Sequence, residues 1–271
     1  MPMINDYNDF IKKVYDLTDI DLSMYKPRQM KRRIDSLISK NNSSNYNEYY
    51  KKITTDENLL KEFINYLTIN VSQFFRNPAQ WDILRSNIIP KIMESNENLK
   101  MWNAGCATGE EPYSLVMTMA DFMPLTKIKV LATDIDEEVL IKAKVGKYND
   151  KSLENLPKTL KNKYFYEKKG MYYIKNEIKD CVVFRKHNLL SDPYPSNCDL
   201  IICRNVLIYF TEEAKDKLYK KFYNALKPGG VFFVGSTEQI IFPRKYGFIP
   251  IRTFFYKRPD DKKKDGADGG I

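Results

Sequence analysis

The first 76 residues carry apolar side chains at helical spacing and contain no run of the strand type. Apolar residues that recur three or four positions apart form one buried face of a helix. Three stripes have this spacing: Phe10, Val14 and Leu17; Met30, Ile34, Leu37 and Ile38; and Leu59, Leu60, Phe63, Ile64 and Leu67. The polar run 41–45, Asn-Asn-Ser-Ser-Asn, predicts a turn between two of these helices. We therefore predict an N-terminal all-helical domain over residues 1–76.

From residue 77 onward, short apolar runs alternate with helical stripes, which is typical of an α/β domain with a parallel sheet. Pro78 suits the first turn of a helix that carries Trp81, Leu84, Ile88, Ile89 and Ile92. Segments 231–235 and 249–256 are predicted to be the last two strands. Their connection is too short for a helical crossover, so we expect the final strand to run antiparallel. We predict a doubly wound sheet within residues 77–259.

Residues 147–183 interrupt this alternation with several short β-type segments separated by turns. We predict a small antiparallel insertion here, preceded by a helical piece around 153–160. The last residues, 260–271, read Asp-Asp-Lys-Lys-Lys-Asp-Gly-Ala-Asp-Gly-Gly-Ile and are predicted to form a disordered tail.

Composition excludes several classes of protein. The chain has 271 residues, 43% of them hydrophobic and 29% charged, as expected for a soluble globular protein. It has neither an 18-residue apolar run nor a signal-peptide core at its start. The four cysteines lack paired metal spacing, and there is only one histidine, His187, which we expect to be structural. We therefore expect no metal site, reduced core thiols, no membrane insertion and a cytoplasmic location.

A net charge of +9 points to an acidic partner, which could be nucleic acid, an anionic membrane or an acidic protein. A generally lysine-rich composition would give a similar balance. On the second predicted helix, Arg28, Lys31 and Arg32 share one face. This face is either solvated or a docking strip for an acidic partner.

Residues 103–109, Asn-Ala-Gly-Cys-Ala-Thr-Gly, form a small-residue turn between a short apolar run and a helical stripe. Gly105 and its small neighbours allow a ligand to approach the backbone closely. A second predicted strand ends about 20 residues later at Asp134, where a carboxylate can accept hydrogen bonds from both hydroxyls of a ribose. Together these features predict a site for an adenosine ligand.

The turn favours S-adenosylmethionine over a dinucleotide. Its small residues do not follow the G-x-G-x-x-G spacing, and Glu110 and Glu111 stand at the start of the next helix. A pyrophosphate would be repelled there, whereas a sulfonium and an ammonium would be attracted. The alternative is that both glutamates only stabilise the helix dipole.

Two further segments are candidates for the same site. Asn70, Ser72 and Arg76 lie between two helical stripes and either form a turn or extend into the adenosine pocket. Asn188, at the end of a strand, either contacts an adenine edge or caps a turn. The segment 204–210 follows the central strand 198–203, and ligands of doubly wound sheets bind beyond the carboxyl ends of strands.

Several motifs occur in order at the spacings of the bacterial chemotaxis receptor methyltransferases, the CheR family. They are N-V-S-Q-F-F-R, N-A-G-C-A-T-G-E-E-P-Y-S, A-T-D-I-D, C-R-N-V-L-I-Y-F and L-K-P-G-G-V-F-F-V-G-S-T-E, together with the basic helix Y-K-P-R-Q-M-K-R-R. The resemblance covers nearly the whole chain. It implies a class I methyltransferase fold after a helical domain, with a small β-subdomain, and methyl transfer from S-adenosylmethionine to receptor glutamates.

The resemblance also implies which residues bind the cofactor: Asn70, Ser72, Arg76, Glu111, Asp134, Asn188, Leu189, Arg204 and Asn205, with Gly105 in the turn. Ser72 stands where relatives often have threonine, and Ala107 replaces the central glycine of the turn. The segment 166–171 is shorter than the loop of relatives that capture a C-terminal receptor pentapeptide. We therefore expect no binding of that tether.

A glutamate carboxylate is already anionic at neutral pH and needs no general base. Catalysis is then expected to consist of alignment and desolvation of the nucleophile. Arg76 and Tyr209 are the candidates for holding the carboxylate. The alternatives are an ion pair with Glu110 or Glu111 for Arg76, and packing for Tyr209.

The expected partners are the acidic methylation helices of chemoreceptors, contacted through Arg28, Lys31 and Arg32, with the chain acting as a monomer. A nucleic-acid methyltransferase is the first alternative. The adenine-N6 enzymes, however, carry an N/D-P-P-aromatic motif where this chain has Arg204-Asn205-Val206-Leu207. A non-catalytic adaptor that binds the same cofactor is the second alternative.

Overall fold

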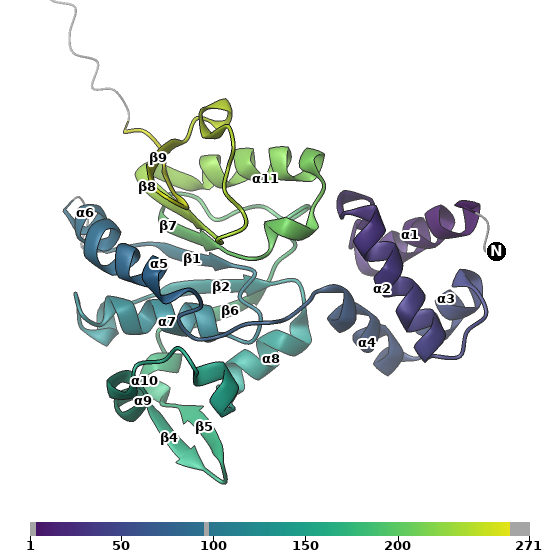
Figure 1. Ribbon diagram of the computed structural model, residues 1–271, viewed down its shortest axis with the longest axis horizontal. Coiled ribbons are helices and arrows are strands. Elements are labelled where there is room, and N and C mark those ends of the chain that lie inside the picture. The colour runs from purple at the N-terminus through teal and green to yellow at the C-terminus, as the bar shows by residue number, and fades with distance from the viewer. Residues whose placement is uncertain (1–3, 95–97, 261–271) are drawn as a thin grey trace, which may run out of the picture.

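The N-terminal part of the molecule is a helical domain with its own core. The computed structural model describes residues 4–94 and 98–260, and Figure 1 shows the helical domain beside a larger α/β domain. Its helices are α1 Ile4–Thr18, α2 Pro27–Lys40, α3 Tyr46–Thr55 and α4 Glu57–Leu67, with a 3-10 turn at Leu22–Met24. The side chains of Asn45 and Asp56 cap α3 and α4. The three predicted apolar stripes pack against one another, which confirms the helical part of the prediction.

The α/β domain is built on a seven-stranded sheet with strand order β6-β2-β1-β7-β8-β10-β9. Its strands are β1 Met101–Ala104, β2 Val130–Asp134, β6 Val182–Lys186, β7 Cys198–Cys203, β8 Leu226–Val234, β9 Ile249–Arg252 and β10 Phe255–Lys257. The first five strands in this order are parallel, while β10 runs antiparallel to both β8 and β9. This topology confirms the predicted class I methyltransferase fold with an antiparallel final strand.

The end of the sheet differs from the prediction in one respect. The segment 249–256 is not one strand but most of a hairpin, because the chain turns at Phe254 with a φ of 70°. Strand β8 also begins earlier than expected, at Leu226, directly after the helix α11 Glu212–Ala225.

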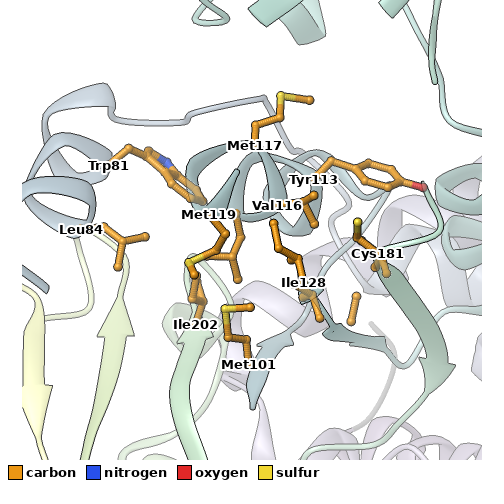
Figure 2. Close-up of a cluster of buried hydrophobic side chains, with 14 of the residues drawn as sticks. Trp81, Leu84, Met101, Tyr113, Val116, Met117, Met119, Ile128, Cys181 and Ile202 are labelled. Carbon is orange, nitrogen blue, oxygen red and sulfur yellow. The ribbon is translucent and has the colours of Figure 1, made fainter. Parts of the chain in front are cut away.

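Alternate side chains of the strands pack on opposite faces of the sheet, as the pleat requires. Met101 and Ile202 lie on the face covered by α7 Glu110–Met119, whereas Trp102 and Ile201 lie on the face covered by α11. Figure 2 shows Val116 and Met119 of α7 above Met101 and Ile202. The remaining helices of this domain are α5 Pro78–Ile83, α6 Ile89–Met93 and α8 Glu137–Val145.

The helix predicted from Pro78 to Ile92 is interrupted by a π-helical turn at Leu84–Ile88. Pro90 has no N–H to donate to the preceding turn, and its ring excludes the carbonyl four residues earlier. The helix therefore widens before the proline and resumes as α6.

The predicted insertion is a three-stranded antiparallel sheet with strands β3 Lys147–Tyr148, β4 Phe165–Lys168 and β5 Met171–Ile174. Its helical pieces are a 3-10 turn at Asp150–Leu153, α9 Lys158–Tyr164 and α10 Asn176–Lys179. The helix predicted around 153–160 therefore corresponds to α9, which begins several residues later, at Lys158. Lys169 and Gly170, both with positive φ, form the two-residue turn of the β4–β5 hairpin.

In the part of the chain that the structure describes, no helix is long and apolar enough to cross a membrane. The four cysteines are buried and free. Within residues 4–94 and 98–260, no cluster of three or more histidine, cysteine or acidic side chains could hold a metal ion. The prediction of a disordered tail concerns residues that, apart from Asp260, lie outside the described ones.

Candidate active site

A cavity of about 920 Å³, part of it open to solvent, lies at the carboxyl ends of β1, β2, β6 and β7. All predicted cofactor-binding and catalytic residues line it: Asn70, Ser72, Arg76, Gly105, Glu111, Asp134, Asn188, Leu189, Arg204, Asn205 and Tyr209. Residues from the helical domain also contribute to the wall, namely Tyr25, Leu67, Thr68 and Ile69. The structure thus brings together a set of side chains that are spread over more than half of the sequence.

The small-residue turn forms the floor of the cavity. The amides of Gly105 and Cys106 both donate to the carbonyl of Thr133, which ties the turn to β2 at 2.8 and 2.9 Å. Gly105 has a φ of 78°, and a Cβ atom there would lie 2.4 Å from Val206. Only glycine fits this position, because the backbone is left-handed and a side chain would collide with Val206.

Asp134 lies at the end of β2 with its carboxylate at the cavity wall. Oδ2 accepts a hydrogen bond from the amide of Ala107 at 2.8 Å, and Oδ1 accepts one from the amide of Asp136 at 3.1 Å. A carboxylate has about four acceptor sites, so each oxygen can still accept a hydrogen bond from a ligand hydroxyl. Burial raises the pKa of Asp134 to about 6, although the two amide hydrogen bonds act in the opposite direction and lower it.

Glu111 and Arg204 form a buried ion pair beneath the cavity, with 2.8 Å between Oε2 and Nη1. The other oxygen of Glu111 accepts from the side-chain amide of Asn103 at 2.7 Å. The guanidinium of Arg204 also donates to the carbonyl of Arg76 at 2.8 Å and to Oε1 of Gln80 at 2.7 Å. Arg204 therefore joins the end of β7, the first turn of α7 and the segment before α5.

Glu110 does not line the cavity and is buried beside it. Burial raises its pKa, and hydrogen bonds from the hydroxyls of Thr108, Ser72 and Ser152 partly offset the shift. The structure therefore assigns the two adjacent glutamates to different surroundings, and only Glu111 faces the ligand space.

The segment between α4 and α5 bends sharply along the cavity. Ile69, Phe75 and Asn77 all have positive φ although none is glycine, so this stretch is held in a strained conformation. The side-chain amide of Asn70 donates to Thr68 at 3.0 Å and to Asp136 at 2.9 Å. These bonds fix Asn70 to both domains.

Arg76 is not paired with either glutamate of α7. Glu111 is paired with Arg204, and the guanidinium of Arg76 donates to the carbonyl of Val71 at 3.2 Å. Tyr209 is half-buried in the cavity wall, and burial raises the pKa of its hydroxyl, while the nearby charges of Arg33 and Arg76 lower it. Both residues thus lie where a substrate carboxylate could be held.

Asn188 forms the capping turn that was one of its two predicted roles, and it lines the cavity. Its Oδ1 accepts from the amide of Leu190 at 3.0 Å, which is the capping turn, and its side-chain amide donates to the carbonyl of Asp19 at 2.9 Å. The side chain therefore links the cavity wall to the helical domain. His187 is buried in the same wall, and its Nε2 lies 3.3 Å from the carbonyl of Pro193, in keeping with a structural role.

Glu238 is a residue of this site that the sequence did not single out. Its carboxylate accepts from the amides of Asn205 at 2.5 Å, Gly235 at 2.9 Å and Ile208 at 3.2 Å, and so fixes the loop 204–210. A Cβ atom at Gly235 would lie 2.4 Å from this carboxylate. Two signals in the sequence could have found it: Glu238 follows a strand end, and it is the last residue of the motif L-K-P-G-G-V-F-F-V-G-S-T-E.

The predicted docking residues lie away from the cavity, on α2. Arg28 and Arg32 are exposed, whereas Lys31 is half-buried with its ammonium 5.9 Å from the ring of Tyr7. The neighbouring Arg33 turns inward, stacks on Tyr66 at 4.5 Å and donates to the carbonyl of Tyr66. The exposed positive charge of α2 is therefore carried mainly by Arg28 and Arg32.

Comparison with known proteins gives consistent matches over almost the whole chain. Residues 5–68 match the family described as CheR methyltransferase, all-alpha domain, and residues 70–255 match CheR methyltransferase, SAM binding domain. A chemotaxis protein methyltransferase from Listeria innocua is 43% identical over 252 residues, covering 93% of this chain and 96% of the relative. One from Borreliella burgdorferi is 35% identical over 250 residues, covering 87% of this chain and 88% of the relative.

Proposed function

Because the chain belongs to the CheR methyltransferase family, we propose that it methylates glutamate side chains of chemoreceptors, giving methyl esters. It is an S-adenosylmethionine-dependent methyltransferase of the chemotaxis system. The expected substrate is the acidic methylation helices in the receptors' cytoplasmic domains. The observation that carries this proposal is the cavity at the sheet's carboxyl edge, lined by all the residues that the family motif predicts for the cofactor.

The residues of the cavity suit S-adenosylmethionine. Gly105 lets the turn pack closely against Val206 at the floor of the cavity, and both oxygens of Asp134 keep acceptor capacity for the ribose hydroxyls. Glu111 provides negative charge for the cationic methionine half, and Asn70, Ser72, Asn188, Leu189 and Asn205 complete the wall. These roles are proposals for this chain.

When bound, S-adenosylmethionine supplies an activated methyl group with a good leaving group. The protein's part is then to orient an incoming carboxylate and to exclude water from it, since this nucleophile is already ionised at neutral pH. We propose that two residues orient the substrate carboxylate: Arg76 attracts it by its positive charge, and Tyr209 donates a hydrogen bond from its neutral hydroxyl. Neither residue needs to move a proton.

The test is incubation with tritiated S-adenosylmethionine and receptor cytoplasmic fragments, followed by mapping of the labelled residues. We expect base-labile label on glutamates of the receptor fragments. Stable label on RNA or DNA would support the nucleic-acid alternative instead, and binding without turnover would support the adaptor.

The affinity for S-adenosylmethionine is expected to fall as the pH falls below about 6. The pKa of Asp134 is about 6 in the free protein, and ribose hydroxyls favour its carboxylate form, so binding lowers this pKa and releases a proton. The dissociation constant should therefore rise up to about tenfold per pH unit below pH 6 and stay flat above pH 7. Calorimetric titrations from pH 5 to pH 8 measure this. Asp134→Asn should bind weakly and lack this dependence; an unchanged pH profile in that variant contradicts the assignment.

Reversal of the exposed charges on α2 is expected to impair receptor methylation but not cofactor binding. In the double variant Arg28→Glu/Arg32→Glu, the acidic receptor helix meets repulsion, so kcat/KM for the receptor should fall at least about tenfold, with a smaller deficit at high salt. Lys12→Glu/Lys51→Glu, a matched reversal of exposed lysines on α1 and α3, should retain receptor activity. Equal loss of receptor methylation and cofactor affinity in the α2 variant would contradict the docking proposal.

We propose that methylation does not require a C-terminal receptor pentapeptide. The β4–β5 hairpin closes in a two-residue turn, Lys169-Gly170, which supports this proposal because it leaves no longer loop to hold a tether. Receptor fragments with and without the terminal pentapeptide should be methylated at rates within about twofold of each other. A large drop on removing the pentapeptide would refute this proposal and leave the enzymatic assignment intact.

A further inference from the structure

The helical domain forms part of the cofactor cavity itself, in addition to carrying the proposed docking face. Tyr25 and residues 67–69 line the cavity opposite the strand ends. Figure 1 shows the helical domain beside the sheet, with α2 close to the loops that follow β7. The inference rests on the proposed cofactor site and adds Tyr25 to it, a residue of the basic-helix motif for which the resemblance implied no cofactor contact.

Tyr25 is held in place by a short β-bridge between the two domains. The amide of Lys26 donates to the carbonyl of Tyr209 at 2.8 Å, and the amide of Thr211 donates to the carbonyl of Met24 at 2.8 Å. The ring of Tyr25 packs on Phe210 with 4.7 Å between centroids. These contacts tie Tyr25 directly to the loop that carries Asn205 and Tyr209.

Tyr25 and Asp134 line the same cavity, and the charge of Asp134 acts on the hydroxyl of Tyr25. Burial raises its pKa, and the negative charges of Asp134 and Asp21 raise it further, so the group remains a neutral donor. Tyr25 lines the cavity, and among residues 4–94 and 98–260 its hydroxyl has no hydrogen-bond partner. A polar group in this position can bond to whatever fills the cavity next to Asp134.

A second attachment of the helical domain ends on Asp136, whose backbone amide contacts Asp134. Oδ2 of Asp136 accepts from Asn65 at 3.3 Å, Thr68 at 3.0 Å and Asn70 at 2.9 Å. The amide of Asp136 in turn donates to Asp134. The helical domain is therefore fixed to the α/β domain at two places, the Tyr25 bridge and Asp136.

We propose that Tyr25 contacts the adenosine half of the cofactor, with its ring closing the cavity and its hydroxyl bonding to the sugar beside Asp134. The cofactor site is then shared by both domains. Residues of the α/β domain hold the floor, and Tyr25 covers the nucleoside from the helical domain.

The test compares ligands that share only the adenosine half. Binding of S-adenosylhomocysteine and of 5′-methylthioadenosine is measured by calorimetry, without receptor, for the wild type, Tyr25→Phe and Tyr25→Ala. Loss of one hydroxyl bond should weaken both ligands by the same factor, about 3- to 10-fold, in Tyr25→Phe, and Tyr25→Ala should weaken them further. The control is Tyr49→Phe, which removes a buried unpaired hydroxyl from the helical core and should leave both affinities unchanged.

Unchanged affinities in Tyr25→Phe overturn the proposal, and so does a loss confined to S-adenosylhomocysteine, because Tyr25 would then face the amino-acid half. If Tyr25→Ala does not fold, Tyr25→Phe still decides. A wild type that binds neither ligand overturns this inference together with the cofactor site. A wild type that binds both but does not methylate receptors overturns only the proposed substrate.

Discussion

Substitution of Asp134 by alanine is expected to weaken binding of S-adenosylmethionine by at least about 100-fold. Two hydrogen bonds from ribose hydroxyls to a carboxylate are each worth about 1.5–3 kcal/mol, and both are lost. The substitution also leaves the amides of Ala107 and Asp136 without their acceptor, so the floor of the cavity loosens. Equilibrium binding of the labelled cofactor measures the effect directly, and kcat/KM for the receptor should fall in parallel.

Asp199→Asn is the matched control for this variant. Asp199 is also a buried carboxylate that accepts from a backbone amide, that of Lys100 at 2.7 Å, and it pairs with Lys227. It lies at the start of β7, whereas Asp134 lies at the carboxyl edge of the sheet. The control should lose stability but keep its cofactor affinity. A similar loss of affinity in both variants, or near-normal binding by Asp134→Ala, would rule out the assigned role of Asp134.

Replacement of Arg204 by methionine should lower the free energy of unfolding by about 3–5 kcal/mol, because it leaves Glu111 as an unpaired buried charge. The Arg204 side chain is fully buried and the Glu111 side chain is only 11% exposed, so water replaces the lost partner poorly. The carbonyl of Arg76 and the side chain of Gln80 lose a donor as well. Urea denaturation with and without cofactor measures both the stability and the accompanying loss of binding.

The pair Arg85–Asp121 offers a comparison at the surface. Its two atoms are also 2.8 Å apart, but the side chains are 55% and 38% exposed. Arg85→Met should therefore cost less than about 1 kcal/mol. The double variant Glu111→Gln/Arg204→Met should regain part of the stability, because the buried charge is gone. If Arg85→Met and Arg204→Met proved equally mild, the ion pair beneath the cavity would not be a structural anchor.

Much of the architecture could be predicted from periodicity alone. The helical stripes and the alternation after residue 77 are local patterns, and the final antiparallel strand followed from the length of one connection. The predicted elements differ from the structure at positions where a single residue changes the backbone conformation. Pro90 forces a π-helical turn into a continuous apolar stripe, and Phe254 adopts a left-handed conformation that sequence preference does not suggest.

The cavity residues were predicted in a different way. Gly105 and Asp134 follow from the chemistry of an adenosine site, and Asn188 was a candidate from its position at a strand end, whereas Leu189 came from the family resemblance. Tyr25 and Glu238 were missed because their importance depends on contacts between distant segments, such as the bond from Glu238 to the amide of Asn205. Both residues stand in quoted motifs, but a motif does not show which distant segments a side chain contacts.

The contacts of Tyr25 and Asp136 between the two domains have a consequence for engineering. Grafting the sheet domain onto an unrelated targeting module would remove the aromatic cover from Tyr25 and the donors to Asp136 at once. Such a hybrid would have to rebuild these contacts before its new specificity could be used. Domain exchanges between relatives should succeed when the segment from Met24 to Thr68 and the strand-end loops that it contacts come from the same relative.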